Sequence, residues 1–390
     1  MIPISKTIFR DEDFVLIQEP LKSGWVVQGK YVKQFEDMFA EFVGAKYAIA
    51  VSNCTTALHI AVATLGIGVG DEVLVPSFTW ISTANCVEYM GATPIFVDID
   101  PHSYNIDVEL IRAKITSRTK AIIPVHLFGN SANMNAIMAI AKEYGIAVIE
   151  DAACGFDTWY GEKHVGTIGA IGCFSFHPRK SITTGEGGMI ITNDDHLAQL
   201  CRSYRDHGAS RPYQERQQAS KAFLLPEYNL VGYNFRLTDI QGALGVAQMQ
   251  KAKELMQARR VGASYYDKIL SDIAWLRLPT AEPSSQHSYQ SYVCWFQPEE
   301  VDLDNVERLM RQRNSVMLYL EERGIITRQG THAPPHQNVY ARKYNLTPHD
   351  YPQGYFAERM TIALPLFPGI THEEMNTVKD NLLAGYTQSL

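Results

Sequence analysis

The chain has 390 residues, of which 46% are hydrophobic and 20% charged, and its formal net charge is −7. This length favours two domains over a single core, and the negative charge argues against a general nucleic-acid-binding protein. The 6 cysteines are scattered without a CxxC pair, so neither a metal site nor a disulfide framework is expected, and a reducing cytoplasm fits.

The N-terminal segment MIPISKTIFRDEDF has no apolar core of the kind found in secretory signals. No later stretch approaches the ~18 consecutive apolar residues that a membrane span requires. We therefore expect a cytoplasmic protein with no leader and no membrane anchor.

The first two-thirds of the chain alternates short apolar runs with helical patterns. The predicted strands are YAIAV, DEVLVPS, ATPIFVDID, KAIIPVHLFG, IAVIEDA and the run at 171–176, and helices are predicted near 81–90, 107–115 and 133–144. This alternation indicates an α/β fold whose mostly parallel sheet is covered on both faces.

Ligands on such sheets bind at the carboxyl ends of the strands. Residues 51–53, residues 76–77, Asp151 and Lys180 all fall at or just past predicted strand ends. We therefore expect one pocket to collect them.

A long helical pattern over 239–270 is predicted to connect the sheet domain to a smaller α+β domain. The division is placed as 1–250 for the large domain with its N-terminal segment and 251–390 for the small domain. In the second part, the pattern predicts a strand at 291–296 and helices at 306–323 and 371–383. It also predicts an exposed loop at 211–223.

The segment SFHPRKSITTGEGG at 175–188 places Lys180 between an apolar run and a glycine-rich stretch. Upstream, Asp151 ends another apolar run in VIEDAAC. A lysine amine can form a Schiff base with pyridoxal 5′-phosphate (PLP), and a carboxylate can keep its ring nitrogen protonated. On these residues alone, a surface lysine and a helix-capping aspartate remain open alternatives.

The segment 52–56, SNCTT, lies between a predicted strand and a predicted helix. Free amides at a helix N-terminus bind phosphate, and the Thr55 hydroxyl could add a further bond. A simple helix cap uses the same geometry, so the pattern by itself leaves both interpretations open.

Several longer segments carry a family resemblance. In order along the chain they are SGWVVQGKYVKQFE, SNCTTALHIA, GDEVLVPSFTWISTANCV, GATPIFVDID, VIEDAA, GTIGAIGCFSFHPRKSITTGEGGMIITND, GYNFRLTDIQGALGVAQ and LPLFPGIT. Together they cover nearly the whole chain. The chain resembles the DegT/DnrJ/EryC1/StrS family of PLP-dependent sugar aminotransferases, which have the fold type I architecture of the aspartate aminotransferase superfamily.

The resemblance implies a role for each cofactor residue. Lys180 would bind the cofactor and shuttle the proton, and Asp151 would pair with the ring nitrogen. The other implied contacts are Cys54, Thr55 and Ser175 at the phosphate, Trp80 stacked on the ring with Phe78 as the runner-up, and Cys154 near the phenolic oxygen. Family members often have glutamine or histidine at the position of Cys154. Asn234 would reach the phosphate of the neighbouring subunit, which implies a homodimer with shared active sites.

The resemblance identifies the residues that would bind the sugar substrate less clearly than those that would bind the cofactor. Arginine and lysine suit a nucleotide diphosphate. The candidates are Trp25, Gln28, Lys30, His177, Arg205, Arg211, His287, Arg328 and His332. HSYQSY at 287–292 resembles a strand near the substrate, although the family often has a second histidine where this chain has Gln290.

The resemblance implies transfer of an amino group from L-glutamate to a nucleotide-linked 4-keto-6-deoxy sugar, for O-antigen, surface glycan or antibiotic synthesis. Amination of a 3-keto sugar or of a cyclitol ketone stays open. Sugar dehydration at C3 is disfavoured because that sister group has histidine at the position of Lys180. A non-catalytic PLP-binding regulator would need a DNA-binding module, and no helix-turn-helix appendage is evident.

Overall fold

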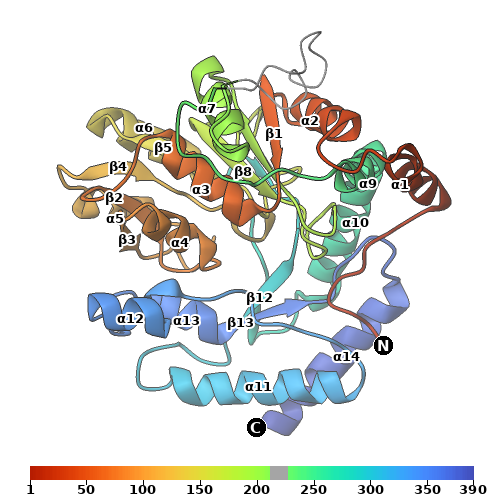
Figure 1. The fold of residues 1–390 in the computed structure, drawn as a ribbon. Coiled ribbons are helices and arrows are strands. Elements are labelled where there is room, and N and C mark those ends of the chain that lie inside the picture. Colours follow the sequence, from red (N-terminus) through yellow and green to blue (C-terminus); the bar gives the residue numbers. More distant parts are fainter. Residues whose placement is uncertain (211–226) are drawn as a thin grey trace.

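The computed structural model in Figure 1 describes residues 1–210 and 227–390. Its centre is a seven-stranded sheet with the strand order β1-β9-β8-β5-β4-β2-β3. These strands are β1 (Tyr47–Val51), β2 (Glu72–Pro76), β3 (Thr93–Val97), β4 (Thr119–Ile122), β5 (Ala147–Asp151), β8 (Ile171–Ser175) and β9 (Gly188–Thr192). Within this sheet β9 is antiparallel to β1 and β8, and the other neighbours pair in parallel.

Helices cover both faces of this sheet, as the apolar runs predict. Alternate residues point to opposite sides of a strand, so in β9 Ile190 packs into one core, while Met189 and Ile191 pack into another. One face lies against α3 (Cys54–Thr64), α4 (Ser82–Tyr89) and α7 (Asp195–Arg205). The other lies against α2 (Lys30–Val43), α5 (Val108–Lys114), α6 (Met134–Tyr144) and α9 (Asp239–Gln250). The predicted parallel α/β sheet is therefore confirmed.

The long helix predicted over 239–270 is wrong in one respect, because it consists of two helices. α9 ends at Gln250, and α10 (Ala252–Leu270) follows after Lys251 leaves helical geometry with φ −113° and ψ 8°. The buried Lys251 ammonium forms an ion pair with Asp13 of α1 (Asp11–Ser23). Lys251 and Asp13 are 238 positions apart in the sequence. The periodicity of the local sequence therefore could not reveal this ion pair.

A second layer packs below the carboxyl edge of the large sheet (Figure 1). It has a three-stranded antiparallel sheet, β10-β12-β13. Its elements are β10 (Leu276–Arg277), β12 (Tyr292–Phe296), β13 (Thr361–Leu364), α11 (Val306–Glu322), α12 (Asn338–Tyr344), α13 (Pro352–Met360) and α14 (His372–Ser389). Its core takes in Phe78 and Phe128 from loops of the large sheet, so the two layers share one hydrophobic contact region.

The remaining elements are short. They are β6 (Trp159–Tyr160), β7 (Lys163–His164) and β11 (Ser285–Gln286) in a small sheet, and the 3₁₀ turns Leu127–Gly129 and Pro334–His336. Near the N-terminus Ile2 pairs with Ile325 and packs in the second layer's core. The domain division at residue 250 stays a prediction. Within residues 1–210 and 227–390, no helix is both long and apolar enough to cross a bilayer.

Candidate active site

The ends of four neighbouring strands bring the predicted cofactor residues together. Gly188 of β9 is paired with both Val51 of β1 and Ser175 of β8, and Asp151 of β5 is paired with Cys173 of β8. Because β1, β8 and β5 run in the same direction, their carboxyl ends meet at one edge of the sheet.

Lys180 lies in a tight turn just past β8. Its backbone N–H donates to the His177 carbonyl at 2.8 Å, and its ammonium donates to the Cys154 sulfur at 3.1 Å. Burial lowers the pKa of Lys180, but Cys154, Cys54 and Asp151 outweigh it, so the pKa is raised. The structure thus brings Lys180, Asp151 and both predicted cysteines to the same place.

Asp151 is 3% exposed at the end of β5. Its carboxylate accepts from the Ala153 N–H at 3.1 Å and from the Thr83 hydroxyl at 2.7 Å. The pKa of Asp151 is raised, because burial outweighs the hydrogen bonds from Thr83 and Ala153 and the charge of Lys180, which lower it. Sequence reasoning missed Thr83, because a threonine in an amphipathic helix carries no local sign of a partner 68 positions away.

The start of α3, at Asn53, Cys54 and Thr55, is where the sequence predicts a phosphate cradle. The Asn53 side chain accepts from Thr56 N–H at 2.9 Å and its carbonyl accepts from Ala57 N–H at 3.1 Å. These bonds satisfy the later amides of the first turn, so the N–H groups of Cys54 and Thr55 have no intrahelical partner. The Thr55 hydroxyl is 2.9 Å from that of Ser82 at the start of α4.

Gly188 allows the start of α3 to lie directly against β9. A Cβ at Gly188 would lie 2.5 Å from the Asn53 carbonyl carbon and oxygen and 2.8 Å from Cys54 N. Ser175 is the β8 partner of Gly188, so it lies across one strand from the start of α3. The Ser175 hydroxyl oxygen accepts from the His177 N–H at 3.5 Å.

The two aromatic candidates for stacking have different surroundings. Trp80 is 58% exposed, and its ring centroid lies 5.6 Å from that of His332. Phe78 is fully buried in the core between the two layers, and a side chain held in that core has no surface free for a cofactor. Trp80 is therefore the better of the two candidates.

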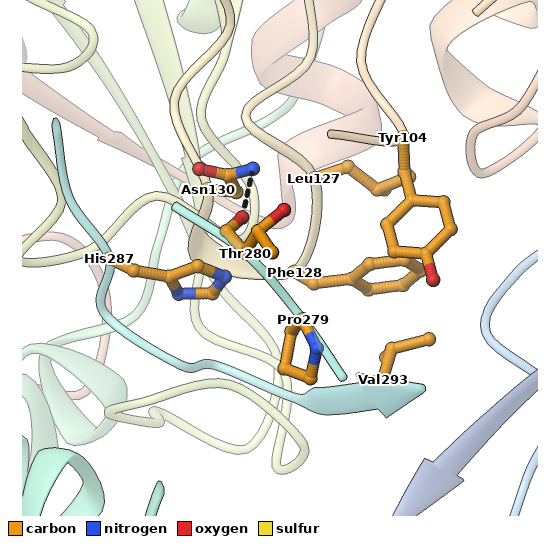
Figure 2. A pocket seen from close by; sticks show the side chains of 8 residues that line it. All are labelled: Tyr104, Leu127, Phe128, Asn130, Pro279, Thr280, His287 and Val293. Atoms are coloured by element: carbon orange, nitrogen blue, oxygen red, sulfur yellow. Dashed lines mark hydrogen bonds between the residues drawn. The ribbon is translucent and has the colours of Figure 1, made fainter. Parts of the chain in front are cut away.

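Two predicted substrate residues lie in buried settings that serve the fold. Arg205 is 3% exposed, forms a 2.7 Å ion pair with Glu36 and donates to the Ala50 carbonyl at 2.8 Å. His287 lines a small cavity between the layers, of about 10 Å³, with room for one water. Figure 2 shows this cavity, which lies among Tyr104, Phe128 and five other side chains. Arg205 and His287 are therefore not part of the proposed site.

Other predicted substrate residues lie nearer to solvent. Trp25 is 41% exposed, and Arg328 and Lys30 are exposed. His177 is half-buried, and its Nδ1 accepts from Arg179 N–H at 3.2 Å. Gln28 is the exception, because it is buried, with 2% exposure. Arg211 lies outside the described residues.

Asn234 is exposed, on a segment beside the end of β1. Two backbone contacts hold this segment against the end of β1. The Phe235 carbonyl accepts from Ser52 N–H at 2.9 Å, and Arg236 forms an antiparallel β-bridge with Val51. Gln290 stands where the family often has a histidine. Its side-chain amide donates to the Arg179 carbonyl at 2.8 Å. That bond fixes the turn next to Lys180.

These groups fit PLP chemically. The cradle offers two free amides to a phosphate, Lys180 offers an amine, and Asp151 has lone pairs beyond the two that Thr83 and Ala153 occupy. Within the part of the chain that the structure describes, no three His, Cys, Asp or Glu side chains gather as a metal site would require.

Comparisons with known proteins agree with this chemistry. The sequence model of the DegT/DnrJ/EryC1/StrS aminotransferase family matches residues 8–383. The spore coat polysaccharide biosynthesis protein SpsC of Bacillus subtilis (strain 168) is 34% identical over 378 residues, 97% of this chain and 95% of SpsC.

Solved structures are also similar. Helicobacter pylori PseC, an aminotransferase in the biosynthesis of pseudoaminic acid, superposes with a TM-score of 0.89 at 26% identity, covering 99% of each chain. S. venezuelae DesV superposes with a TM-score of 0.88 at 26% identity, covering 100% of this chain and 98% of DesV.

Proposed function

The chain belongs to the DegT/DnrJ/EryC1/StrS aminotransferase family, and from this premise we propose which sugar this PLP-dependent sugar aminotransferase aminates. The proposed acceptor is a nucleotide-linked 4-keto-6-deoxy sugar, and the proposed amino donor is L-glutamate. The product would be a 4-amino-4,6-dideoxy sugar for a surface glycan such as O-antigen. The similarity to SpsC, a spore coat polysaccharide biosynthesis protein, supports a polysaccharide destination.

The observation that carries the transamination chemistry is the placement of Lys180. Its amine lies beside Cys154 and close enough to Asp151 for each to alter the pKa of the other. Bound PLP supplies an electron sink for the carbon that loses or gains a proton. Lys180 Nζ, once free, is the base that takes this proton and the acid that returns it.

The other residues bind and orient. Asp151, which is only 3% exposed, would accept a hydrogen bond from the protonated ring nitrogen. The Cys54 and Thr55 amides and the Ser175 hydroxyl hold the phosphate at the positive end of the α3 dipole. The exposed Trp80 ring would stack on the cofactor ring, and the Cys154 thiol would contact its phenolic oxygen.

The acceptor assignment rests on the segment HPRKSITTGEGG, which resembles the 4-keto aminotransferases more than the 3-keto enzymes. The test is a panel of UDP-, dTDP- and GDP-linked 4-keto-6-deoxy sugars with L-glutamate, read by mass spectrometry of the product. We expect the ketone oxygen of one of them to be replaced by an amine. Conversion of a 3-keto sugar or a cyclitol ketone alone would overturn the assignment.

Lys180 itself is tested by borohydride reduction of the PLP-loaded protein and peptide mapping. We expect the label on Lys180 and none in Lys180→Ala. A label on another lysine would refute the assignment.

We also propose a homodimer with shared active sites, in which Asn234 donates to the phosphate of the partner's cofactor. Its exposed position supports this role, because the adjacent Phe235 carbonyl accepts from Ser52 N–H just before α3. Mixing inactive Lys180→Ala chains with inactive Asn234→Ala chains should restore activity, because one site of a mixed dimer has both residues intact. Mixed dimers, verified with labelled chains, that stay inactive would place both residues in the same chain's site.

The cysteine pattern supports a cytoplasmic location for this enzyme. All six cysteines are free, and five of them are buried. Free thiols without disulfides are typical of a reducing compartment.

A further inference from the structure

Two buried threonines, Thr79 and Thr83, form a chain of hydrogen bonds that ends at the Asp151 carboxylate. The Thr83 hydroxyl is 2.7 Å from Asp151 Oδ2, and the Thr79 hydroxyl is 3.1 Å from that of Thr83. Thr83 is fully buried, and Thr79 and Asp151 are 1% and 3% exposed. Water therefore cannot replace either bond.

The direction of these bonds follows from a count of protons. An ionised carboxylate can only accept, so the single hydroxyl proton of Thr83 points to Asp151. The Thr83 oxygen is then left as an acceptor, and the Thr79 hydroxyl must be the donor between the two threonines. The chain of hydrogen bonds is thus a one-way relay from Thr79 through Thr83 to Asp151.

This relay fixes the orientation of the carboxylate. Oδ1 accepts from Ala153 N–H at 3.1 Å on the β5 side, and Oδ2 accepts from Thr83 on the α4 side. Rotation of the carboxylate would break one of these bonds in a site without water. The relay itself is anchored to the second layer, because Thr79 N–H donates to the His332 carbonyl at 3.0 Å.

We propose that Thr83, oriented by Thr79, is a positioning residue that keeps the Asp151 carboxylate ionised and turned toward the PLP ring nitrogen. The inference rests on the proposed role of Asp151 and deepens it. It also connects Thr83 to Trp80, since both lie in one turn in which Thr83 N–H donates to the Trp80 carbonyl at 3.2 Å.

The charges around Asp151 support this role. The titratable groups that interact with it are Lys180, His126, Cys54, Cys86 and Cys173. Burial raises the pKa of all three thiols, so they are neutral and cannot stabilise the carboxylate. Burial also raises the pKa of Asp151, and the bond from Thr83 is the largest influence that lowers it.

The test compares Thr83→Val, which removes the hydroxyl but keeps the shape, with Thr83→Ser, which keeps the hydroxyl. In the PLP-loaded enzyme, we expect Thr83→Val to move the pH titration of the cofactor absorbance to higher pH. A less ionised Asp151 holds the ring proton less well, and a less protonated ring withdraws less charge from the imine nitrogen whose titration changes the absorbance. We also expect PLP affinity and kcat with L-glutamate to fall roughly tenfold, with KM nearly unchanged. Thr83→Ser should restore all three.

The matched control is Thr192→Val, which removes another buried hydroxyl, one that donates to the Ala170 carbonyl at 2.8 Å at the far end of β9. It should leave the absorbance titration unchanged. Asp151→Asn serves as the positive control.

A wild-type titration and PLP affinity in Thr83→Val would overturn the inference, provided that Asp151→Asn changes both. If Asp151→Asn changes neither, the proposed role of Asp151 fails together with the inference. Equal losses in Thr83→Val and Thr83→Ser would reduce Thr83 to a packing residue. The titration and the affinity need no substrate, so they are independent of the proposed donor and acceptor.

Discussion

Gly188→Ala is the sharpest test of the phosphate cradle, because a single methyl group should block it. The added Cβ would lie 2.5 Å from the Asn53 carbonyl and 2.8 Å from Cys54 N, and these are backbone atoms that cannot rotate away. Ordinary contact begins near 3.4 Å, so β9 and the start of α3 must separate by nearly an ångström. Overpacking of this kind costs about 1–3 kcal/mol of folding free energy.

The same displacement moves the Cys54 amide away from the phosphate. We expect the dissociation constant of PLP to rise at least tenfold, or about 1.4 kcal/mol. The assay is an absorbance titration of cofactor-free protein with PLP, with thermal unfolding measured by circular dichroism on the same samples.

Gly68→Ala is the matched control, because the nearest atom to its Cβ would be the Met90 carbonyl oxygen at an ordinary 3.7 Å. Gly68→Ala should bind PLP like the wild type. A folded Gly188→Ala protein whose PLP dissociation constant stays within about twofold of the wild-type value would refute the cradle.

Three further predictions follow from buried polar groups. Asp151→Asn should keep some cofactor but lose roughly one to two decades of kcat, and turnover within about twofold of wild type would show that another group faces the ring nitrogen. Glu150→Gln should lower the free energy of unfolding, measured by urea titration, by about 3–5 kcal/mol. The reason is that the fully buried Glu150 carboxylate accepts hydrogen bonds from His126 and three backbone amides. A loss below about 1 kcal/mol would contradict this. His164 is held neutral, with Nε2 accepting from Asp157 N–H, and burial lowers its pKa to about 4. Since the unfolded histidine binds its proton near pH 6.5, stability should fall between pH 6.5 and 4, by up to roughly 3 kcal/mol, and less steeply in His164→Gln; equal slopes would exclude His164 as the cause.

The sequence by itself determined most strands and helices of the large sheet, and it pointed to Lys180 and Asp151. Apolar runs such as YAIAV and IAVIEDA become buried strands whatever their neighbours are, because strands covered on both faces must be apolar throughout. Their carboxyl ends then place Asp151 and the Lys180 turn at the same edge. The segments around these two residues also carried the family resemblance, which the family match confirms.

Only the tertiary structure decided the surroundings of that pair. The contact of Thr83 with Asp151 depends on where the fold places α4 relative to the end of β5, and the ion pair of Lys251 depends on Asp13 in α1. The burial of Arg205 against Glu36 likewise spans 169 positions of the chain. Periodicity and capping report interactions within a few residues, whereas hydrogen bonds between buried side chains are set by which elements come to lie against each other.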